Sequence, residues 1–121
     1  MGDFQKLNVW QKSKDLAVYL YKLSNEGDLA KDFGLKDQIK RASVSIAANI
    51  AEGEQLQSNL QAIRHFYIAR GSAAELLTHL IIAHEINYIT KMDYQDLQEK
   101  INEISGMLTN LIKARQNSKP K

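Results

Sequence analysis

Apolar residues recur at the three- and four-residue spacing of helices over most of the chain. This spacing predicts helices over residues 7–23, 35–56 and 58–89, and a last one from residue 93 through residue 112. The single proline lies at position 120, and no Asn-Gly or Asp-Gly turn is flanked by alternating hydrophobics, so no strand pairing is needed. We therefore expect an all-α fold, an antiparallel up-down four-helix bundle over residues 1–115, with residues 116–121 as a disordered basic tail.

Helix starts and chain reversals also have signals in the sequence. The expected N-caps are Asn8, Ser58 or Asn59, and Asp93 with Asp96 in the first turn after it. Gly27 and Gly34 are the expected reversal points in the long connection between the first two helices. Gly71 is a weak point inside the third helix, at a cost of about 1 kcal/mol relative to Ala.

The second predicted helix has two apolar sides. Its core side is expected to contain Ile39, Ala42, Ser43, Ile46 and Ile50. A second side of small residues, formed by Val44, Ala48 and Ala51, lies nearly opposite, and residues 42–51 carry no charge. One small bundle cannot bury both sides, so we expect the second to be an interface between copies of the chain.

A polar stripe runs between these two sides and consists of Arg41, Ser45, Asn49 and Glu52. It is either a binding or catalytic groove or a buried polar network that fixes helix and subunit geometry. The second interpretation is favoured, because no nucleophile and base have a distinguishing arrangement. We expect Arg41 and Glu52 to be buried, with Glu75 as the partner of Arg41.

Composition narrows the function classes. With 121 residues, 13.7 kDa, 44% apolar and 25% charged residues, the chain fits one globular domain and excludes an enzyme of several modules. The absence of cysteine removes disulfides and thiolate metal sites, and makes the cytoplasm the expected location. No signal peptide or membrane-spanning run is apparent.

The catalytic and metal-binding patterns of helical bundles are missing. No Glu-x-x-His pair of a di-iron site occurs, and His79 and His84 are five residues apart, too far around a helix to share a metal. A glycine-rich phosphate loop is also lacking, since Gly71 lies inside a helix. We expect no enzyme activity, no cofactor, no metal and no small-molecule substrate.

The net charge of +2 is too small to indicate nucleic-acid binding by itself. Basic residues expected to face outward, as candidates for phosphate contact, are Lys36, Lys40, Arg64, Arg70, Lys113 and Arg115, with Lys119 and Lys121 in the tail. The simpler interpretation of the basic end is that it solubilises the chain.

Four segments carry a resemblance to a known family: LNVWQK at 7–12, FGL at 33–35, QIKRASVSIAANIAEG at 38–53 and IARGSAAEL at 68–76. Together they resemble the four helix bundle protein family, also called the 23S ribosomal RNA intervening-sequence protein family. The resemblance implies an up-down bundle and ring-shaped homopentamers. The family is also similar to the accessory proteins of diversity-generating retroelements, whose pentameric barrels bind nucleic acid and a reverse transcriptase. Residues 25–32 lack the Phe-Pro usual in the family, which leaves the path of this loop open.

Two functions stay open. In the first, a non-enzymatic oligomer, most simply a pentamer, presents a ring surface to RNA, DNA or a nucleic-acid enzyme. Five copies raise the charge of +2 to about +10, so phosphate contacts supply affinity without base-reading residues. In the second, the self-associated protein binds another protein and has no nucleic-acid role.

Overall fold

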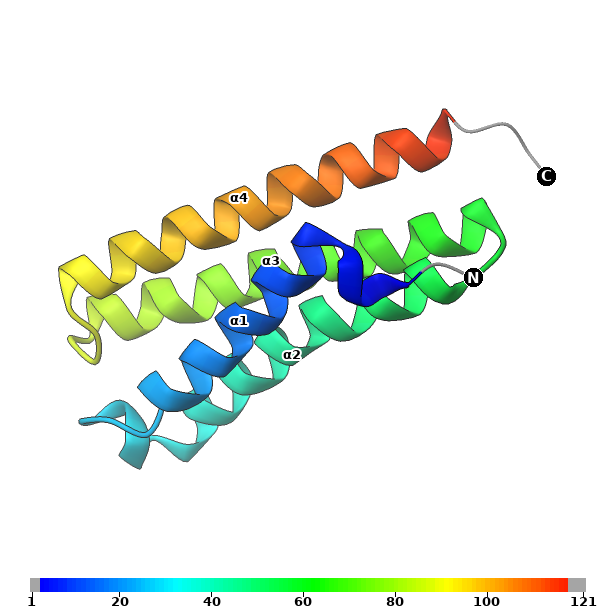
Figure 1. Ribbon diagram of the computed structural model, residues 1–121. Helices are drawn as coiled ribbons and strands as arrows, with labels where there is room; N and C mark the ends of the chain where they lie inside the picture. The colour runs from blue at the N-terminus through cyan, green and yellow to red at the C-terminus, as the bar shows by residue number, and fades with distance from the viewer. Residues whose placement is uncertain (1–2, 118–121) are drawn as a thin grey trace.

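The computed structural model describes residues 3–117, and within them the regular elements are helical. The four long helices are α1 (Asn8–Leu23), α2 (Phe33–Gln55), α3 (Asn59–Glu85) and α4 (Lys91–Gln116). Short 3-10 helices at Phe4–Lys6 and Leu29–Lys31 precede α1 and α2. Successive helices run in opposite directions, each packs on the next, and α4 returns to α1 (Figure 1). The predicted antiparallel bundle is confirmed.

The helix at the C-terminal end extends through Gln116, and Asn117 is its C-cap. Residues 118–121 of the predicted tail lie outside the described residues. No helix in residues 3–117 is both long and apolar enough to cross a membrane.

The core consists of the apolar sides that the spacing predicts. On α2, the buried residues are Ile39, Ala42, Ser43, Ile46, Ile50 and Gly53. They pack with Phe66 and Leu76 of α3 and with Leu108 of α4 in one continuous cluster of buried side chains. Removal of apolar surface from water stabilises a fold by about 25 cal/mol per Å², so this cluster is the main source of stability.

Helices α2 and α3 approach each other closely at Gly53. A Cβ atom at this position would lie 2.6 Å from Cε1 of Phe66 and 3.1 Å from the carbonyl oxygen of Ala62. Phe66 is fully buried, so its ring can move only by displacing its neighbours in the core. The two helices can therefore pack this tightly only with glycine at position 53.

The helix starts agree with the predicted caps in one case of three. Ser58 caps α3, its Oγ accepting from the backbone N–H of Gln61 at 3.4 Å. Asn8 is not a cap: α1 begins at Asn8 itself, because Leu7, the C-cap of the 3-10 helix Phe4–Lys6, also occupies the N-cap position of α1, without a side-chain bond. Asp93 is not a cap either, since Thr90 Oγ1 accepts from the Asp93 N–H at 3.1 Å and starts α4 earlier.

The chain reversals differ from expectation at Gly34. Gly27 has a φ of 59° and turns the chain, as predicted. Gly34 instead lies in the first turn of α2, because Asp32 caps that helix by accepting from the Leu35 N–H at 3.0 Å. The third helix ends at Glu85 and not at residue 89, since Asn87 adopts a φ of 65°.

Candidate functional site

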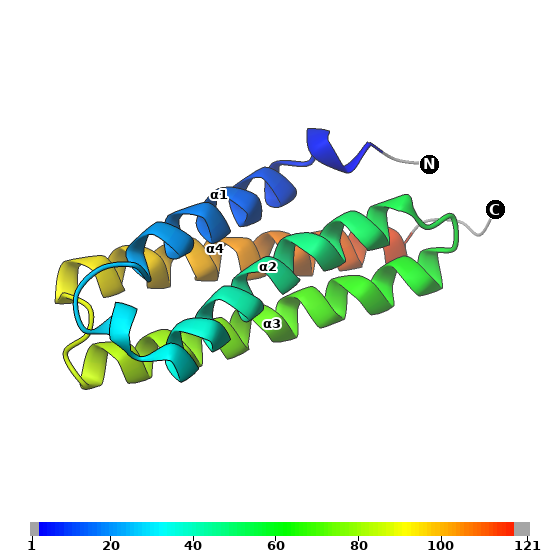
Figure 2. The same ribbon diagram turned by 90° about the horizontal axis from the view of Figure 1, so that it is seen from below.

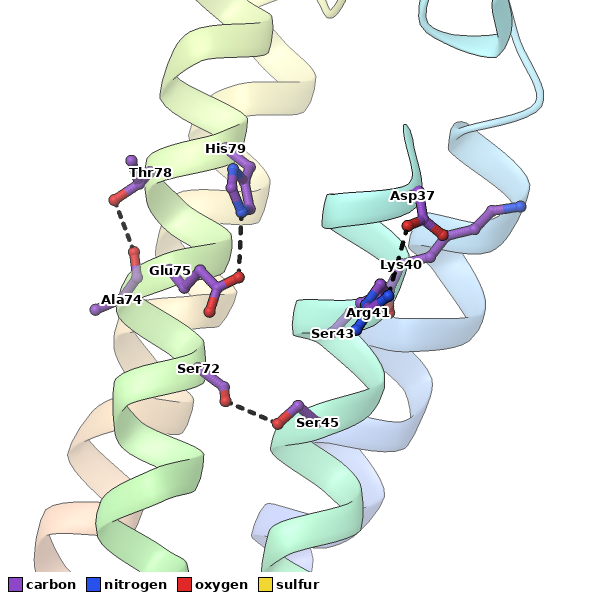
Figure 3. Close-up of polar contacts among 10 residues, drawn as sticks. All are labelled: Asp37, Lys40, Arg41, Ser43, Ser45, Ser72, Ala74, Glu75, Thr78 and His79. Carbon is purple, nitrogen blue, oxygen red and sulfur yellow. Dashed lines mark hydrogen bonds and ion pairs between the residues drawn. The ribbon is translucent and has the colours of Figure 1, made fainter. Parts of the chain in front are cut away.

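Helix α2 lies between α1 and α3 (Figure 2), and its two flanks differ in chemistry. The flank toward α3 is held by what we call the polar seam: Ser45 and Asn49 of α2 with His65 and Ser72 of α3. The hydroxyls of Ser45 and Ser72 lie 2.8 Å apart (Figure 3). Asn49 Nδ2 donates to the Ser45 carbonyl at 2.9 Å, and Asn49 Oδ1 lies 3.1 Å from His65 Nδ1.

The hydrogen bonds of Asn49 determine which ring nitrogen of His65 carries the proton. Because Asn49 Nδ2 donates to a backbone carbonyl, its Oδ1 must be the atom that faces the histidine, and His65 Nδ1 is therefore the donor. Glu52 Oε2 lies 3.4 Å from the same nitrogen. Each of these polar groups has a partner within the pair of helices. Such a network positions α2 against α3 and leaves neither serine activated as a nucleophile.

The ends of the polar stripe do not join the seam. The Arg41 side chain is 76% exposed and faces Asp37 on its own helix at 3.9 Å. The predicted Arg41–Glu75 pair is wrong, since Glu75 Oε2 lies 3.3 Å from His79 Nε2 on its own helix (Figure 3). Glu52 is 65% exposed, so the expectation that both stripe ends are buried is also wrong for the described chain.

The reason is the rotation of the helix along the stripe. At about 100° per residue, the step from 41 to 45 turns the side chain about 40° toward α3, and the step from 49 to 52 turns it about 60° away. The middle of the stripe therefore faces the neighbouring helix, and its ends face solvent, where long charged side chains stay hydrated.

The flank of α2 toward α1 holds an open groove of about 590 Å³, which we call the apolar groove. Its walls are mainly apolar and aromatic side chains: Trp10, Ala17, Val18 and Tyr21 of α1, and Val44, Ala47 and Ala48 of α2. Lys14 and Lys22 flank it on α1. Val44 is 43% exposed. Two of the three expected interface residues, Val44 and Ala48, are thus exposed in this groove, and Ala51 is half-buried beyond it.

Sequence reasoning found the α2 wall of this groove and missed the α1 wall. Val18 and Tyr21 are three residues apart and lie off the core side of α1, which contains Leu16 and Leu20. Two large apolar residues at helical spacing outside the core stripe were the available signal. The hollow itself arises because Ala47 and Ala48 are small and do not fill the space beside α1.

Two of the basic residues proposed for phosphate contact face inward instead. Arg115 Nη2 lies 2.7 Å from Glu54 Oε1, its Nη1 donates to Asn59 Oδ1 at 2.9 Å, and the Arg115 and Glu54 side chains are only 22% and 15% exposed. Arg70 is half-buried and donates to Thr109 Oγ1 at 3.1 Å. Arg115 fixes the end of α4 to the α2–α3 turn, because its guanidinium forms two charge-assisted bonds there. The expectation that these two side chains face outward is wrong.

The other four candidates lie nearer the surface. Arg64 and Lys113 are exposed. Lys36 donates to the Ala30 carbonyl at 3.1 Å, and Lys40 Nζ lies 4.7 Å from the centre of the Tyr21 ring at one end of the apolar groove. Lys119 and Lys121 lie outside the described residues. Of the six described candidates, Arg64 and Lys113 are therefore the ones that are both exposed and not engaged in one of these contacts.

A smaller hollow of about 320 Å³ lies between α1 and α4, and its own charges pair across it. Lys12 Nζ lies 3.1 Å from Glu103 Oε1, and Lys100 Nζ lies 5.0 Å from the Tyr19 ring centre. Burial, with a smaller contribution from Asp93, raises the pKa of Tyr19. Within residues 3–117, no group of three His, Asp or Glu residues is placed to hold a metal.

Comparison with known proteins identifies relatives of similar fold and length. Residues 5–110 match the family model described as 23S rRNA-intervening sequence protein. The chain is also similar to a protein of unknown function from the S23 ribosomal protein family of Bacteroides thetaiotaomicron VPI-5482, whose crystal structure was determined at 1.70 Å. That likeness has a TM-score of 0.80 and 34% identity, and covers 87% of this chain and 98% of the other. A comparison with curated proteins gives no match.

Proposed function

The chain belongs to the 23S rRNA-intervening sequence protein family, and on that premise we propose that it is a non-enzymatic scaffold that assembles from several copies. The surface proposed for assembly is the apolar groove between α1 and α2. The proposed number of copies is five, the ring size that the resemblance to the family implies.

The observation that carries this proposal is the chemistry of the groove. Aromatic and aliphatic side chains from two helices surround a hollow of about 590 Å³ that is open to water. Contiguous apolar patches of this kind mark association surfaces, because covering them gains about 25 cal/mol per Å² of apolar area. Hot-spot residues of interfaces are enriched in Trp and Tyr, and the groove contains one of each, Trp10 and Tyr21.

The test of assembly is the molar mass measured by light scattering. The native chain is expected to have a mass of several times 13.7 kDa. Val44→Glu places a charge in the groove at a partly exposed helical position, so the fold is kept and assembly is lost. Met92→Glu changes an equally apolar, exposed residue on α4 and serves as the control that assembles normally. If Val44→Glu retains the native mass, the groove is not the assembly surface.

Nucleic acid is the second proposed partner of the assembly. The support for it is the outward placement of Arg64 and Lys113, which ring symmetry would repeat around the assembly. Binding through such residues is indifferent to sequence and weakens steeply as salt rises. Fluorescence anisotropy with single- and double-stranded probes at low salt tests this. An assembled protein that binds neither probe would favour a protein partner.

A further inference from the structure

The outer surface of α3 carries two exposed isoleucines that the bundle leaves uncovered, with Gly71 and Glu75 between them, and we call this surface the ridge. The ridge consists of Ile68, Gly71, Glu75 and Ile82, with Ile68 and Ile82 being 43% and 45% exposed. Ile68, Glu75 and Ile82 follow one another at seven-residue intervals, which places them in a nearly straight line along the helix. At ~1.5 Å per residue, this line is about 21 Å long.

Gly71 gives this ridge a notch. It lies in the middle of α3, is exposed, and a Cβ atom there would meet nothing within 4 Å. Glycine weakens a helix relative to alanine, and within the described chain no contact requires it at this position. Gly53, by contrast, is required by Phe66. An exposed glycine between Ile68 and Glu75 suits the close approach of a second backbone.

Building on the proposed function, we propose that the ridge on α3 of one copy lies in the apolar groove between α1 and α2 of the next copy. The two surfaces are complementary in kind, because the isoleucines are partly exposed and the alanines at positions 47 and 48 leave a hollow beside α1. Charges of opposite sign also lie on them: Glu75, which pairs with His79, is on the ridge, and Lys22 and Lys14, which pairs with Asp15, flank the groove. The groove spans α1 from Trp10 to Tyr21, about 16 Å along the helix, a length comparable to that of the ridge.

This contact joins the ridge of one copy to the groove of the next. Each copy therefore contributes one groove and one ridge. Contacts of that type are head-to-tail, and they build a closed ring or a filament and not an isolated symmetric pair. The groove lies between α1 and α2, and the ridge lies on α3. Figure 2 shows that α1 and α3 lie on opposite sides of α2. Each added copy is therefore turned relative to the one before it.

The test combines one variant of each surface, measured by light scattering with circular dichroism to confirm folding. Val44→Glu removes the groove and Ile82→Glu removes the ridge, and both change partly exposed helical positions. Each variant alone is expected to be a monomer of 13.7 kDa. An equimolar mixture retains one intact groove and one intact ridge, so it is expected to form a heterodimer of twice that mass and nothing larger.

The outcomes separate this inference from the proposed function. If Ile82→Glu assembles like the native chain while Val44→Glu does not, the groove is the assembly surface but the ridge is not its occupant. If both variants are monomeric and their mixture stays monomeric at the highest soluble concentration, the head-to-tail contact is wrong. A native mass for Val44→Glu would instead overturn the proposed function itself.

Discussion

The two flanks of α2 differ in the chemistry of their side chains and in how far the chain itself covers them. Toward α3, the helix carries polar side chains, and each finds its partner within the chain: Ser45 with Ser72, and Asn49 with His65. Toward α1, it carries small apolar side chains, and the space beside them stays open as the apolar groove. One flank is closed within the chain, and the other stays open, which is where we propose that a second copy binds.

The difference follows from the cost of leaving each kind of group exposed or unpaired. A polar group that is buried without a partner costs about 1–3 kcal/mol, so a polar flank must be completed inside the chain. An apolar flank loses only the gain from burial and tolerates water until a partner covers it. Polar pairing therefore marks the flank of α2 that must be closed within the chain, and the exposed apolar flank is the one that we propose for assembly.

The largest expected effect concerns the tight contact on the α3 flank. Gly53→Ala adds a methyl group 2.6 Å from the Phe66 ring, and overpacking of this kind costs about 1–3 kcal/mol of unfolding free energy. Chemical denaturation measures it in the Val44→Glu background, which we expect to be monomeric. The matched control is Gly71→Ala in the same background, which meets no neighbour and is expected to gain about 1 kcal/mol from helix propensity. Equal effects of the two substitutions would contradict the assignment of Gly53 as a packing glycine.

A smaller loss is expected from opening the polar seam. Asn49→Ala removes the bonds to the Ser45 carbonyl and to His65, which lowers the unfolding free energy by about 1 kcal/mol while the assembled mass stays unchanged. Arg41→Ala is the control from the same stripe, and its loss is under about 0.5 kcal/mol because the side chain is exposed. Loss of assembly in Asn49→Ala would show that the seam, and not only the groove, contributes to the interface.

The smallest expected effect is a change in how stability depends on pH. It arises at the N-terminal end of α2, where the Tyr88 hydroxyl donates to Asp32 Oδ2 at 3.2 Å. Desolvation, and then this hydrogen bond, raise the pKa of Tyr88 above its ordinary value of about 10. The folded state therefore holds the proton longer than the unfolded state, so the contribution is present below about pH 10 and is lost as pH rises through the folded pKa. Tyr88→Phe is expected to flatten the loss of stability as pH rises from the ordinary tyrosine pKa of about 10 through the folded pKa, measured by denaturant midpoints. An unchanged slope would show that Tyr88 does not titrate late.

Helical periodicity was sufficient to predict the core, because burial depends on spacing that the sequence displays directly. Ile39, Ile46 and Ile50 were assigned to the core side of α2 and are fully buried. Single hydrogen bonds were not predictable in the same way. Thr90 displaces Asp93 as a cap by starting α4 one turn earlier, a competition between neighbouring residues that spacing does not decide.

The candidate site was predicted in part for the same reason. Val44 and Ala48 lie outside the core stripe of α2, and that position alone indicated an uncovered surface. The opposite wall, with Trp10 and Tyr21, depends on how α1 packs across α2, which no local pattern records. The pairing of Arg41 failed because Asp37, one turn away on the same helix, is a nearer partner than any residue on α3.

The most direct test of the central claim is the accessibility of the groove floor in the native assembly. The chain contains no cysteine, so Ala48→Cys introduces a single thiol in the groove, and Asn102→Cys introduces one on the exposed surface of α4 as the control. The rate of labelling with a maleimide reports exposure of each thiol. We predict that the thiol at position 48 is strongly protected in the native background and reacts as fast as that at position 102 in the Val44→Glu background. Equally fast labelling at both positions in a native assembly would contradict the claim that another copy covers the apolar groove.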